Sequence, residues 1–437
     1  MRIIRHSECG KLLAHLAARS VALDAELMKL VTSIVDDVRT RGDRALLDYA
    51  ERFDKVELAE LRISVEQLQR YAASVDERVV QALREAIRNV RAFHERQLEK
   101  SWTINATTGV ELGQRIAPIE RVGLYVPGGT AAYPSSVVMN VVPAQIAGVE
   151  RILVATPPRT LAENPAVAAA LLELNVTEVY AVGGAQAIAA LAFGTETVPR
   201  VDKITGPGNR YVAATKKLVF GVVGIDSIAG PTEVVIVADD TAVPEFVAAD
   251  LLAQAEHGED ASAILITTSE TLAQKVAEEV ERQLATLSRR EIAAVSLREY
   301  GAIILVEDLA EAGEIVNELA PEHVEIVTRD DELVAAKIKY AGAIFFGAYT
   351  PEALGDYLAG PNHVLPTGRT ARFSSPLGVY DFVKRTSLLR YSEAAFREVA
   401  ESVAVLAEAE GLGGHARSAL IRKSSFTQRH KGGHKAR

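Results

Sequence analysis

Cysteine is almost absent from this chain of 437 residues, because Cys9 is the only one. A single cysteine excludes an intrachain disulfide and any metal site built from several cysteines. The chain also lacks a run of about 18 uncharged apolar residues, which a membrane-spanning helix would need. Its N-terminal segment carries charges where a signal peptide has an apolar core. We therefore expect a cytoplasmic protein.

Acidic residues outnumber basic ones in the body of the chain. The formal net charge is −10 at pH 7, although residues 421–437 hold six lysines or arginines and no acid. A body this acidic repels nucleic acid and anionic membranes. The basic end is typical of a solvated, disordered tail over residues 423–437, and a docking segment is the alternative.

The order of the expected elements indicates an α/β protein with more than one domain. A chain of this length exceeds one compact core. Apolar residues recur at helical spacing over residues 27–38 and 80–90. From about residue 115, short apolar runs such as RILVAT, EVVIVAD and AIILV alternate with alanine-rich helical stretches. These runs fall into two sets, which predicts two domains with parallel sheets.

The chain turns helical again after about residue 375. Its clearest segment, SEAAFREVAESVAVLAEAEGL, is too small to fold alone. We expect a C-terminal arm that packs on another domain or on a partner subunit.

Histidines divide into two groups by their neighbours. Four lie beside carboxylates or amides at the ends of expected elements and are candidates for chemistry: His257, His323, His363 and His415. The other five are expected at the surface: His6, His15, His94, His430 and His434.

The segment DLLAQAEHGED places Asp250, Gln254 and His257 on one face of an expected helix that ends at Gly258. A neutral imidazole and an amide oxygen can both bind a divalent metal. Two such ligands do not make a site, and the same polar stripe could simply face solvent.

The segment LAPEHVEI places Glu322 and His323 just before an expected strand. Histidine suits proton transfer near neutral pH, and a glutamate can activate water. Adjacent side chains on an extended backbone point to opposite sides, so the pair shares a task only if the backbone turns. A surface ion pair is the alternative.

Two further segments carry polar residues among glycines and prolines. In GDYLAGPNHVLPT, Asp356 and His363 are expected in a loop, and such loops often carry function. The carboxylate of Asp356 would complete a mixed nitrogen and oxygen shell typical of zinc. In EGLGGH, the arm offers His415 and Glu410.

Glycine-rich loops follow several expected strands: VPGGTAAYPSS, VGGAQAIAALAFG, TGPGNRYV and AGPTE. Their backbone N–H groups would line the carboxyl edge of a parallel sheet, where α/β folds bind ligands. None fits the GxGxxG pattern, because Tyr211 stands where the third glycine would follow Gly206 and Gly208. These loops are compatible with a nucleotide but do not identify one.

Together these segments, in this order, closely resemble the histidinol dehydrogenase family. The resemblance runs from the N-terminal helices to about Arg422 and includes RVGLYVPGG, YPSSVVMN, DKITGPGN, DLLAQAEHG, APEHVEI, GDYLAGPNHVLPT and EGLGGH. It implies two incomplete Rossmann-like domains, one of them discontinuous, with small helical N- and C-terminal parts. The implied boundaries are 1–20 for the N-terminal segment, 21–125 with 233–375 for the larger domain, 126–232 for the second domain and 376–422 for the arm.

The resemblance also implies a zinc ion, NAD and a homodimer with shared sites. The implied zinc ligands are Gln254, His257, Asp356 and, from the arm of the other subunit, His415. The implied substrate contacts are Thr232, Gln254, His257, Glu322, His323, Asp356, His363, Glu410 and His415. The implied NAD contacts are Tyr125, Gln186 and Asn209.

The implied reaction oxidises L-histidinol to L-histidinal and then, through the hydrated aldehyde, to L-histidine, with reduction of two NAD. His323 corresponds to the general base, and Glu322 to the group that activates water. A cysteine-bound intermediate is implausible, since Cys9 lies far from every motif. In AGPTE the chain has Thr232 where the family commonly has serine, which keeps the hydroxyl but adds a methyl group and stiffness at χ1.

Three other functions fit the same residues. The nearest is a relative with the same fold and zinc site that oxidises another small alcohol. A zinc hydrolase would use Glu322 as its base and zinc to polarise a carbonyl. A catalytically silent oligomeric scaffold is the third.

Overall fold

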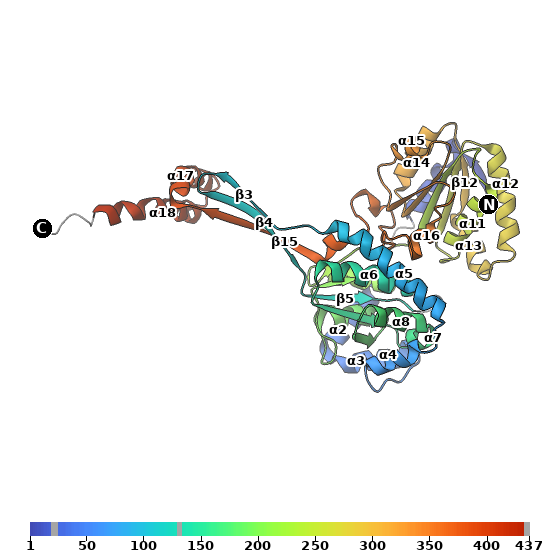
Figure 1. The fold of residues 1–437 in the computed structure, drawn as a ribbon, viewed down its shortest axis with the longest axis horizontal. Helices are drawn as coiled ribbons and strands as arrows, with labels where there is room; N and C mark the ends of the chain where they lie inside the picture. The colour runs from blue at the N-terminus through green and yellow to red at the C-terminus, as the bar shows by residue number, and fades with distance from the viewer. Residues whose placement is uncertain (19–24, 129–132, 432–437) are drawn as a thin grey trace. The chain divides into compact units, whose positions relative to one another are not determined.

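The computed structural model describes residues 1–18, 25–128 and 133–431, with side chains described as far as residue 423. Its contacts divide the chain into two compact units (Figure 1). The first consists of Met1–Leu98 and Pro118–Phe382, and the second of Glu99–Ala117 and Val383–Arg437. Over the described residues, no helix is both long and apolar enough to cross a bilayer.

The first unit contains a six-stranded parallel sheet made mostly by the later part of the chain. Its strand order is β1 (Ile3–Arg5), β12 (Ala302–Leu305), β11 (Ser262–Thr267), β10 (Glu233–Ala238), β13 (His323–Val327) and β14 (Ala343–Phe346). Alternate residues of β10 face opposite sides, so Val234 and Ile236 join one core while Val235 and Val237 join the other. Both faces are therefore covered, as expected for a parallel sheet.

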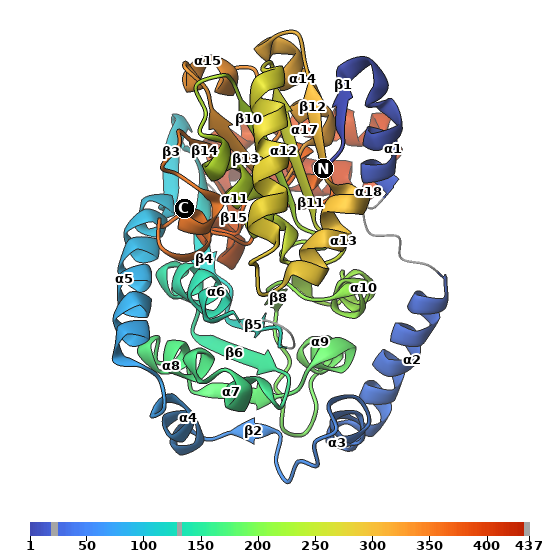
Figure 2. The same cartoon turned by 90° about the vertical axis from the view of Figure 1, so that its right-hand side faces the viewer.

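Helices flank this sheet on both sides (Figure 2). One core includes residues of α11 (Pro244–Ala255), α12 (Glu270–Leu284) and α13 (Arg290–Tyr300). The other includes residues of α1 (Gly10–Ala18), α14 (Leu309–Leu319) and α15 (Asp331–Ala335).

A second six-stranded sheet lies in the same unit. Its order is β2 (Arg62–Ile63), β7 (Glu178–Ala181), β6 (Arg151–Thr156), β5 (Arg121–Tyr125), β8 (Lys203–Thr205) and β9 (Gly224–Ile225), and only β2 is antiparallel to its neighbour. The strand order reverses at β5, because later strands add first on one side and then on the other. One core joins it to residues of α2 (Ala25–Arg41), α3 (Asp43–Tyr49), α9 (Gly184–Phe193) and α10 (Arg210–Val219).

The remaining helices of the second sheet's part pack on one another. α5 (Glu77–His94) packs on α6 (Pro134–Ala147), and α4 (Val65–Ala72) packs on α8 (Pro165–Glu173). The short α7 (Thr160–Glu163) contacts both α4 and α8.

The predicted α/β class is confirmed, but the expected domain boundaries differ from the structure. Residues 21–125 were expected with 233–375, whereas α2 packs in the core of the second sheet and β5 is one of its strands. The N-terminal segment, expected to stand apart, adds β1 and α1 to the first sheet. An amphipathic helix shows that it has a buried face, but its sequence does not say which sheet covers that face.

The second unit combines a three-stranded sheet with two helices. The strand order is β15 (Val383–Tyr391), β4 (Val110–Pro118) and β3 (Trp102–Thr107), followed along the chain by α17 (Glu393–Ala409) and α18 (Gly413–Lys431). The second unit therefore takes up the chain at Val383, whereas the arm was expected from residue 376, and it includes a hairpin from residues 102–118 that the sequence did not assign to the arm.

Helix α18 continues to Lys431, where the sequence suggested a disordered tail from residue 423. The physical reason is that residues 415–431 contain neither glycine nor proline, and the run ends at Gly432 and Gly433, which are typical helix stops. Residues 432–437 lie outside the described part of the chain.

Candidate active site

The predicted catalytic pair lies at the amino end of β13, beside the start of β10. His323 is the first residue of β13, where it pairs in register with Val234 of β10, and Glu322 precedes it. Both side chains are buried. Glu322 Oε2 and His323 Nδ1 are 3.8 Å apart, so these sequence neighbours do reach a common site. Their burial excludes the surface ion pair considered above.

The ring of His323 is oriented by the backbone. Its Nδ1 donates to the carbonyl oxygen of Glu233 at 3.0 Å, which leaves Nε2 as the proton-accepting nitrogen. Nε2 is buried, has no hydrogen-bond partner among the described residues and lies 3.9 Å from Asp356 Oδ1. Burial, with a smaller contribution from the nearby His257 and His363, lowers the pKa of His323 to about 3, although the hydrogen bond to Glu233 opposes this shift. The ring is therefore neutral and able to accept a proton.

Glu322 is held by two donors. Its Oε2 accepts from the hydroxyl of Thr232 and, at 3.1 Å, from the N–H of Glu233. Burial raises the pKa of Glu322 well above its usual range, and these two hydrogen bonds oppose that shift. A carboxylate with a raised pKa is a stronger base than one in water.

Carboxylates and an imidazole converge beside this pair. His257, Glu352 and Asp356 each offer a ligand atom, and these atoms lie within 4.8 Å of one another. Glu352 and Asp356 are four residues apart on α16 (Glu352–Tyr357), so they share one face of that helix. Asp356 was expected in a loop and is in this helix instead. Pro351 is the N-cap of the helix and has an extended backbone, which its fixed φ allows.

His257 stands just after α11, whose last turn carries Gln254. The His257 Nδ1 donates to the carbonyl oxygen of Ala253 at 3.0 Å, which leaves Nε2 available to a metal. Gln254 is completely buried, so the solvent-facing reading of this stripe is wrong. Asp250 of the same stripe contacts Glu325, and its charge also acts on Glu352.

The amide of Gln254 is placed between two polar groups. Its NH2 donates to Thr232 Oγ1 at 3.0 Å, and its other end lies 3.0 and 3.2 Å from the two carboxylate oxygens of Glu352. If the amide were reversed, its NH2 would donate to Glu352, but its oxygen would then need the hydroxyl proton of Thr232. The single hydroxyl proton of Thr232 already goes to Glu322. An amide oxygen facing a carboxylate needs a proton or a cation between them.

The electrostatics of this cluster also favour a cation. Burial raises the pKa of Asp356 to about 6, and burial together with neighbouring acids raises that of Glu352 well above its usual range. Among the described residues, the carboxylates of this cluster form ion pairs with His323 and with no lysine or arginine. Buried acids without basic partners are unfavourable unless protons or a metal neutralise them. Imidazole, amide and carboxylate donors together fit zinc.

A second histidine, which is partly buried, lies near His323 and influences its pKa. His363 follows the Gly360–Pro361 turn, and its Nε2 is buried with no hydrogen-bond partner among the described residues. Burial lowers its pKa to about 4. Its neighbour Asn362 anchors the loop, because its Nδ2 donates to the carbonyl oxygen of Met139 at 2.6 Å.

His94 was expected at the surface and is fully buried. Its Nδ1 donates to Gln97 Oε1 at 2.7 Å, and its Nε2 lies 3.5 Å from Asn362 Nδ2. The helical spacing placed it correctly in α5, but the loop that covers it comes from a distant part of the sequence.

The predicted NAD contacts gather at the carboxyl edge of the second sheet. Tyr125 ends β5, Gln186 lies in the first turn of α9, and Asn209 is the N-cap of α10. Strand order reverses at β5, which is where open α/β sheets bind ligands. Asn209 Oδ1 accepts from the N–H groups of Tyr211 and Val212, so its Nδ2 remains available to a ligand.

The same edge has polar atoms that a dinucleotide would satisfy. The hydroxyls of Thr156 and Thr160 are buried without a partner among the described residues. The Tyr125 hydroxyl accepts from the N–H of Gly184 at 3.0 Å and is itself buried. A Cβ at Gly183 would lie 2.9 Å from Pro157, so only glycine lets these two loops approach. These features fit NAD.

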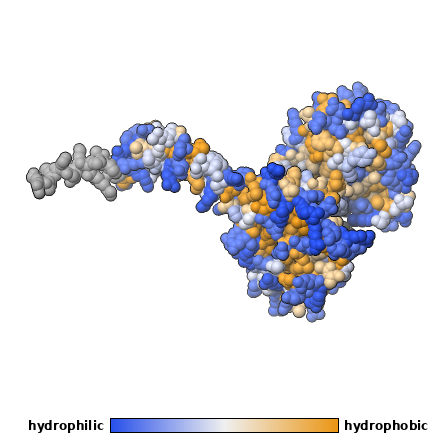
Figure 3. All heavy atoms as spheres, viewed as in Figure 1, coloured by the Kyte–Doolittle hydropathy of each residue, from blue (hydrophilic) through white to orange (hydrophobic). Residues whose placement is uncertain are grey.

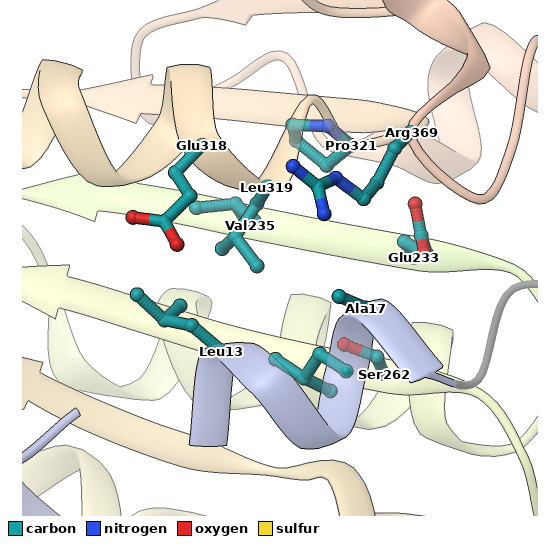
Figure 4. A pocket seen from close by; sticks show the side chains of 10 residues that line it. Leu13, Ala17, Glu233, Val235, Ser262, Glu318, Leu319, Pro321 and Arg369 are labelled. Carbon is teal, nitrogen blue, oxygen red and sulfur yellow. The ribbon is translucent and has the colours of Figure 1, made fainter. Parts of the chain in front are cut away.

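A separate pocket lies between α1 and the first sheet (Figure 4). Leu13, Leu16 and Leu319 are among the residues that line it, and none of the predicted site residues does. We therefore do not assign the reaction to it.

The chain matches the family model described as histidinol dehydrogenase over residues 17–423. The chain belongs to the histidinol dehydrogenase family. It is 53% identical over 404 residues to the histidinol dehydrogenase of Bacillus subtilis (strain 168), covering 92% of this chain and 95% of that protein. It is 51% identical over 414 residues to the histidinol dehydrogenase of Aquifex aeolicus (strain VF5), covering 94% and 96%.

A solved member of this family has the same fold. The crystal structure of histidinol dehydrogenase from Elizabethkingia anophelis matches with a TM-score of 0.91 and 36% identity, over 98% of this chain and 99% of that one. Family membership, which the motifs predicted, is thus confirmed.

The structure brings together most of the residues implied by the resemblance to the histidinol dehydrogenase family. Gln254, His257 and Asp356 lie beside Glu322 and His323 in the first unit. His415 and Glu410 belong to the second unit, and their roles stay predictions. Sequence reasoning missed Glu352. Its signal was the four-residue spacing from Asp356, which becomes visible only once the segment is read as a helix.

Proposed function

We propose that this protein oxidises L-histidinol through L-histidinal to L-histidine, with reduction of two NAD. The observation that carries the proposal is the buried, partner-free Nε2 of His323 beside Glu322 and a group of zinc-type ligands. The names of its relatives support the substrate. We also expect the protein to act in the cytoplasm.

In the first oxidation, the substrate hydroxyl gives its proton to His323 Nε2 while hydride leaves the carbinol carbon. NAD, when bound, accepts the hydride in each oxidation. The hydrogen bond from Nδ1 to the Glu233 carbonyl keeps the ring in the required tautomer and orientation. His323 must return its proton to solvent before the next step.

In the second oxidation, Glu322 takes a proton from the water that adds to the aldehyde carbon. The resulting hydrate then loses a hydroxyl proton to His323 as the second hydride leaves, which gives the carboxylate product. Thr232 and the N–H of Glu233 hold the Glu322 carboxylate in place. No cysteine takes part.

Zinc would be held by Gln254, His257, Asp356 and His415 of the partner subunit, and when bound it supplies a positive charge that positions the substrate. Glu352, whose carboxylate lies beside the Gln254 amide and the ligand atoms of His257 and Asp356, would add negative charge that favours a bound cation. His363 and Glu410 would complete the substrate contacts.

NAD would bind at the carboxyl edge of the second sheet, in contact with Tyr125, Gln186 and Asn209. The start of α10 and the free Asn209 Nδ2 would offer donors to it. Burial raises the pKa of Tyr133, which precedes α6, and the charge of the Asp356 carboxylate adds to that shift. This interaction between Tyr133 and Asp356 supports an NAD site next to the metal ligands.

The second unit supports a homodimer. Its buried core is small, made by Ala404, Ala407 and Ala416 with Leu420 packed against them. Large apolar side chains on its surface are exposed, among them Trp102, Ile104, Leu389, Val405 and Leu406. Figure 3 shows hydrophobic residues among hydrophilic ones on the surface of this unit. An apolar surface on a unit with so small a core is typical of a subunit interface.

The test is an assay of NAD reduction with L-histidinol as substrate. We expect two NADH for each histidinol consumed, and loss of turnover after removal of metal by a chelator, with recovery on adding zinc. A single NADH per substrate, or turnover only with another alcohol, would contradict the proposal. Hydrolysis without NAD would instead favour the zinc hydrolase.

A further inference from the structure

Lys216 is an unusual lysine, because its side chain is almost completely buried within α10. Its ammonium group forms an ion pair with Asp226, whose side chain is buried as well, at 2% and 5% exposure. A buried ion pair is weak evidence for stability, since the cost of removing both charges from water offsets their attraction. The groups that this pair binds are therefore more informative than the pair itself.

Both members of the pair bind the same residue. Lys216 Nζ donates to the carbonyl oxygen of Gly206 at 3.0 Å, and Asp226 Oδ2 accepts from the N–H of Gly206 at 2.8 Å. Every backbone hydrogen-bonding group of Gly206 is thus bound by one ion pair. Asp226 Oδ1 also accepts from the N–H of Ser227 at 2.6 Å, which fixes the carboxylate.

Gly206 begins the turn between β8 and α10. Its φ of +110° is strained for other residues, and a Cβ there would lie 2.2 Å from the carbonyl oxygen of Tyr125. Three residues later the turn ends at Asn209, the N-cap of α10. The ion pair therefore fixes the turn between two of the proposed NAD contacts, Tyr125 and Asn209.

We propose that Lys216 and Asp226 are positioning residues for NAD. They hold the turn of residues 206–209 in the shape that presents Asn209 Nδ2 and the start of α10 to the dinucleotide. The inference rests on the proposed function, and neither residue was among the sequence candidates. Because the turn is already ordered before NAD binds, less conformational entropy is lost on binding.

The test compares Lys216→Met with wild type in the full-length, zinc-loaded enzyme. We expect the dissociation constant of NADH and the KM of NAD to rise on the order of tenfold. The KM of histidinol and the zinc content should not change, which a general structural defect would not produce. Lys216→Arg should recover most of the NAD affinity.

The matched control is Arg151→Met. Arg151 pairs with Glu178 at 2.6 Å on the same sheet, but these are the first residues of β6 and β7, at the amino ends of the strands. This variant should keep wild-type NAD affinity. Wild-type NAD affinity in Lys216→Met, or an equal loss in Arg151→Met, would overturn the inference.

A second variant keeps the test decisive if Lys216→Met does not fold. Asp226→Asn has nearly the same shape, and a loss confined to NAD binding would support the inference, whereas wild-type affinity would overturn it. Wild-type enzyme that oxidises histidinol without binding NAD would overturn the proposed function, and the inference with it. These outcomes are distinguishable because wild type and variants are measured separately.

Discussion

His323 shows how a single residue is prepared for proton transfer by its backbone contact. One ring nitrogen is committed to the Glu233 carbonyl, so the other has a defined protonation state and direction. We predict that His323→Asn keeps zinc and substrate binding but loses nearly all turnover. Zinc content, histidinol binding by calorimetry and kcat measure the three quantities. Substantial remaining turnover would mean that another residue takes the proton.

Thr232 is the point where this chain departs from the serine common in its family. Its hydroxyl donates to Glu322 and accepts from Gln254, so the added methyl group has not displaced the hydroxyl from its partners. We predict that Thr232→Ser retains activity, whereas Thr232→Val loses about 1.5–3 kcal/mol of stabilisation, which is a fall of roughly ten- to a hundredfold in kcat. Steady-state kinetics with histidinol measures both, and equal activity in the two variants would refute this role for the hydroxyl.

Glu352 is the residue of the metal group that the sequence did not indicate. Because it faces the Gln254 amide and lies beside His257 and Asp356, we predict that Glu352→Ala weakens zinc binding about ten- to a hundredfold. A chelator competition titration measures this. The control is Glu259→Ala, an exposed glutamate near the same loop, which should bind zinc as wild type does. Unchanged affinity in Glu352→Ala would show that the residue is not needed at the site.

At the scale of elements, the sequence predicted which segments form helices and strands more reliably than it predicted which of these elements pack together. Helical spacing identified α2 and α5, and the apolar runs identified most strands of both sheets, but not the edge strands β1, β2 and β9. The grouping of α2 with the wrong sheet and the surface assignment of His94 share one cause. Which face of an element is covered depends on contacts between residues far apart in the sequence, and periodicity carries no information about them.

The candidate site was predictable to a similar extent. Glu322, His323, Gln254 and His257 were suspected from their spacing, but only the family resemblance joined them to Asp356. Lys216 and Asp226 gave no signal, since a lysine in an amphipathic helix is normally solvated. Their importance follows from burial, which the sequence does not display.

The buried His94 of α5 makes the free energy of unfolding depend on pH. Burial lowers the pKa of His94 in the folded state, so the unfolded chain takes up a proton first as the pH falls. Folding stability from this residue is thus complete above about pH 6.5 and is lost below it, by at most about 1.4 kcal/mol per pH unit.

We predict that His94→Gln unfolds with a shallower loss of stability between pH 6.5 and 5 than wild type does. Urea unfolding at several pH values measures the difference in unfolding free energy between the two proteins. The contributions of the other histidines cancel in this difference, because both proteins contain them. Between pH 7.5 and 8.5 the two curves should run parallel. Parallel curves below pH 6 as well would show that His94 is protonated in the folded protein.

At the scale of the whole molecule, the proposed site needs two chains. If His415 of the partner subunit completes each zinc site, inactive His323→Asn and inactive His415→Asn chains should restore partial activity when mixed. Each heterodimer would then contain one site with both residues intact. Heterodimers purified with two different tags, yet without activity, would contradict the shared site.

Cys9 has a consequence for experiments on the whole molecule. It lies in the core between α1 and the first sheet, and burial raises the pKa of its thiol. Only thiolate reacts readily with alkylating reagents, so the folded protein should resist them. Because the chain has no second thiol, the labelling rate measures how often the N-terminal helix separates from the sheet, with no reporter group added to the protein.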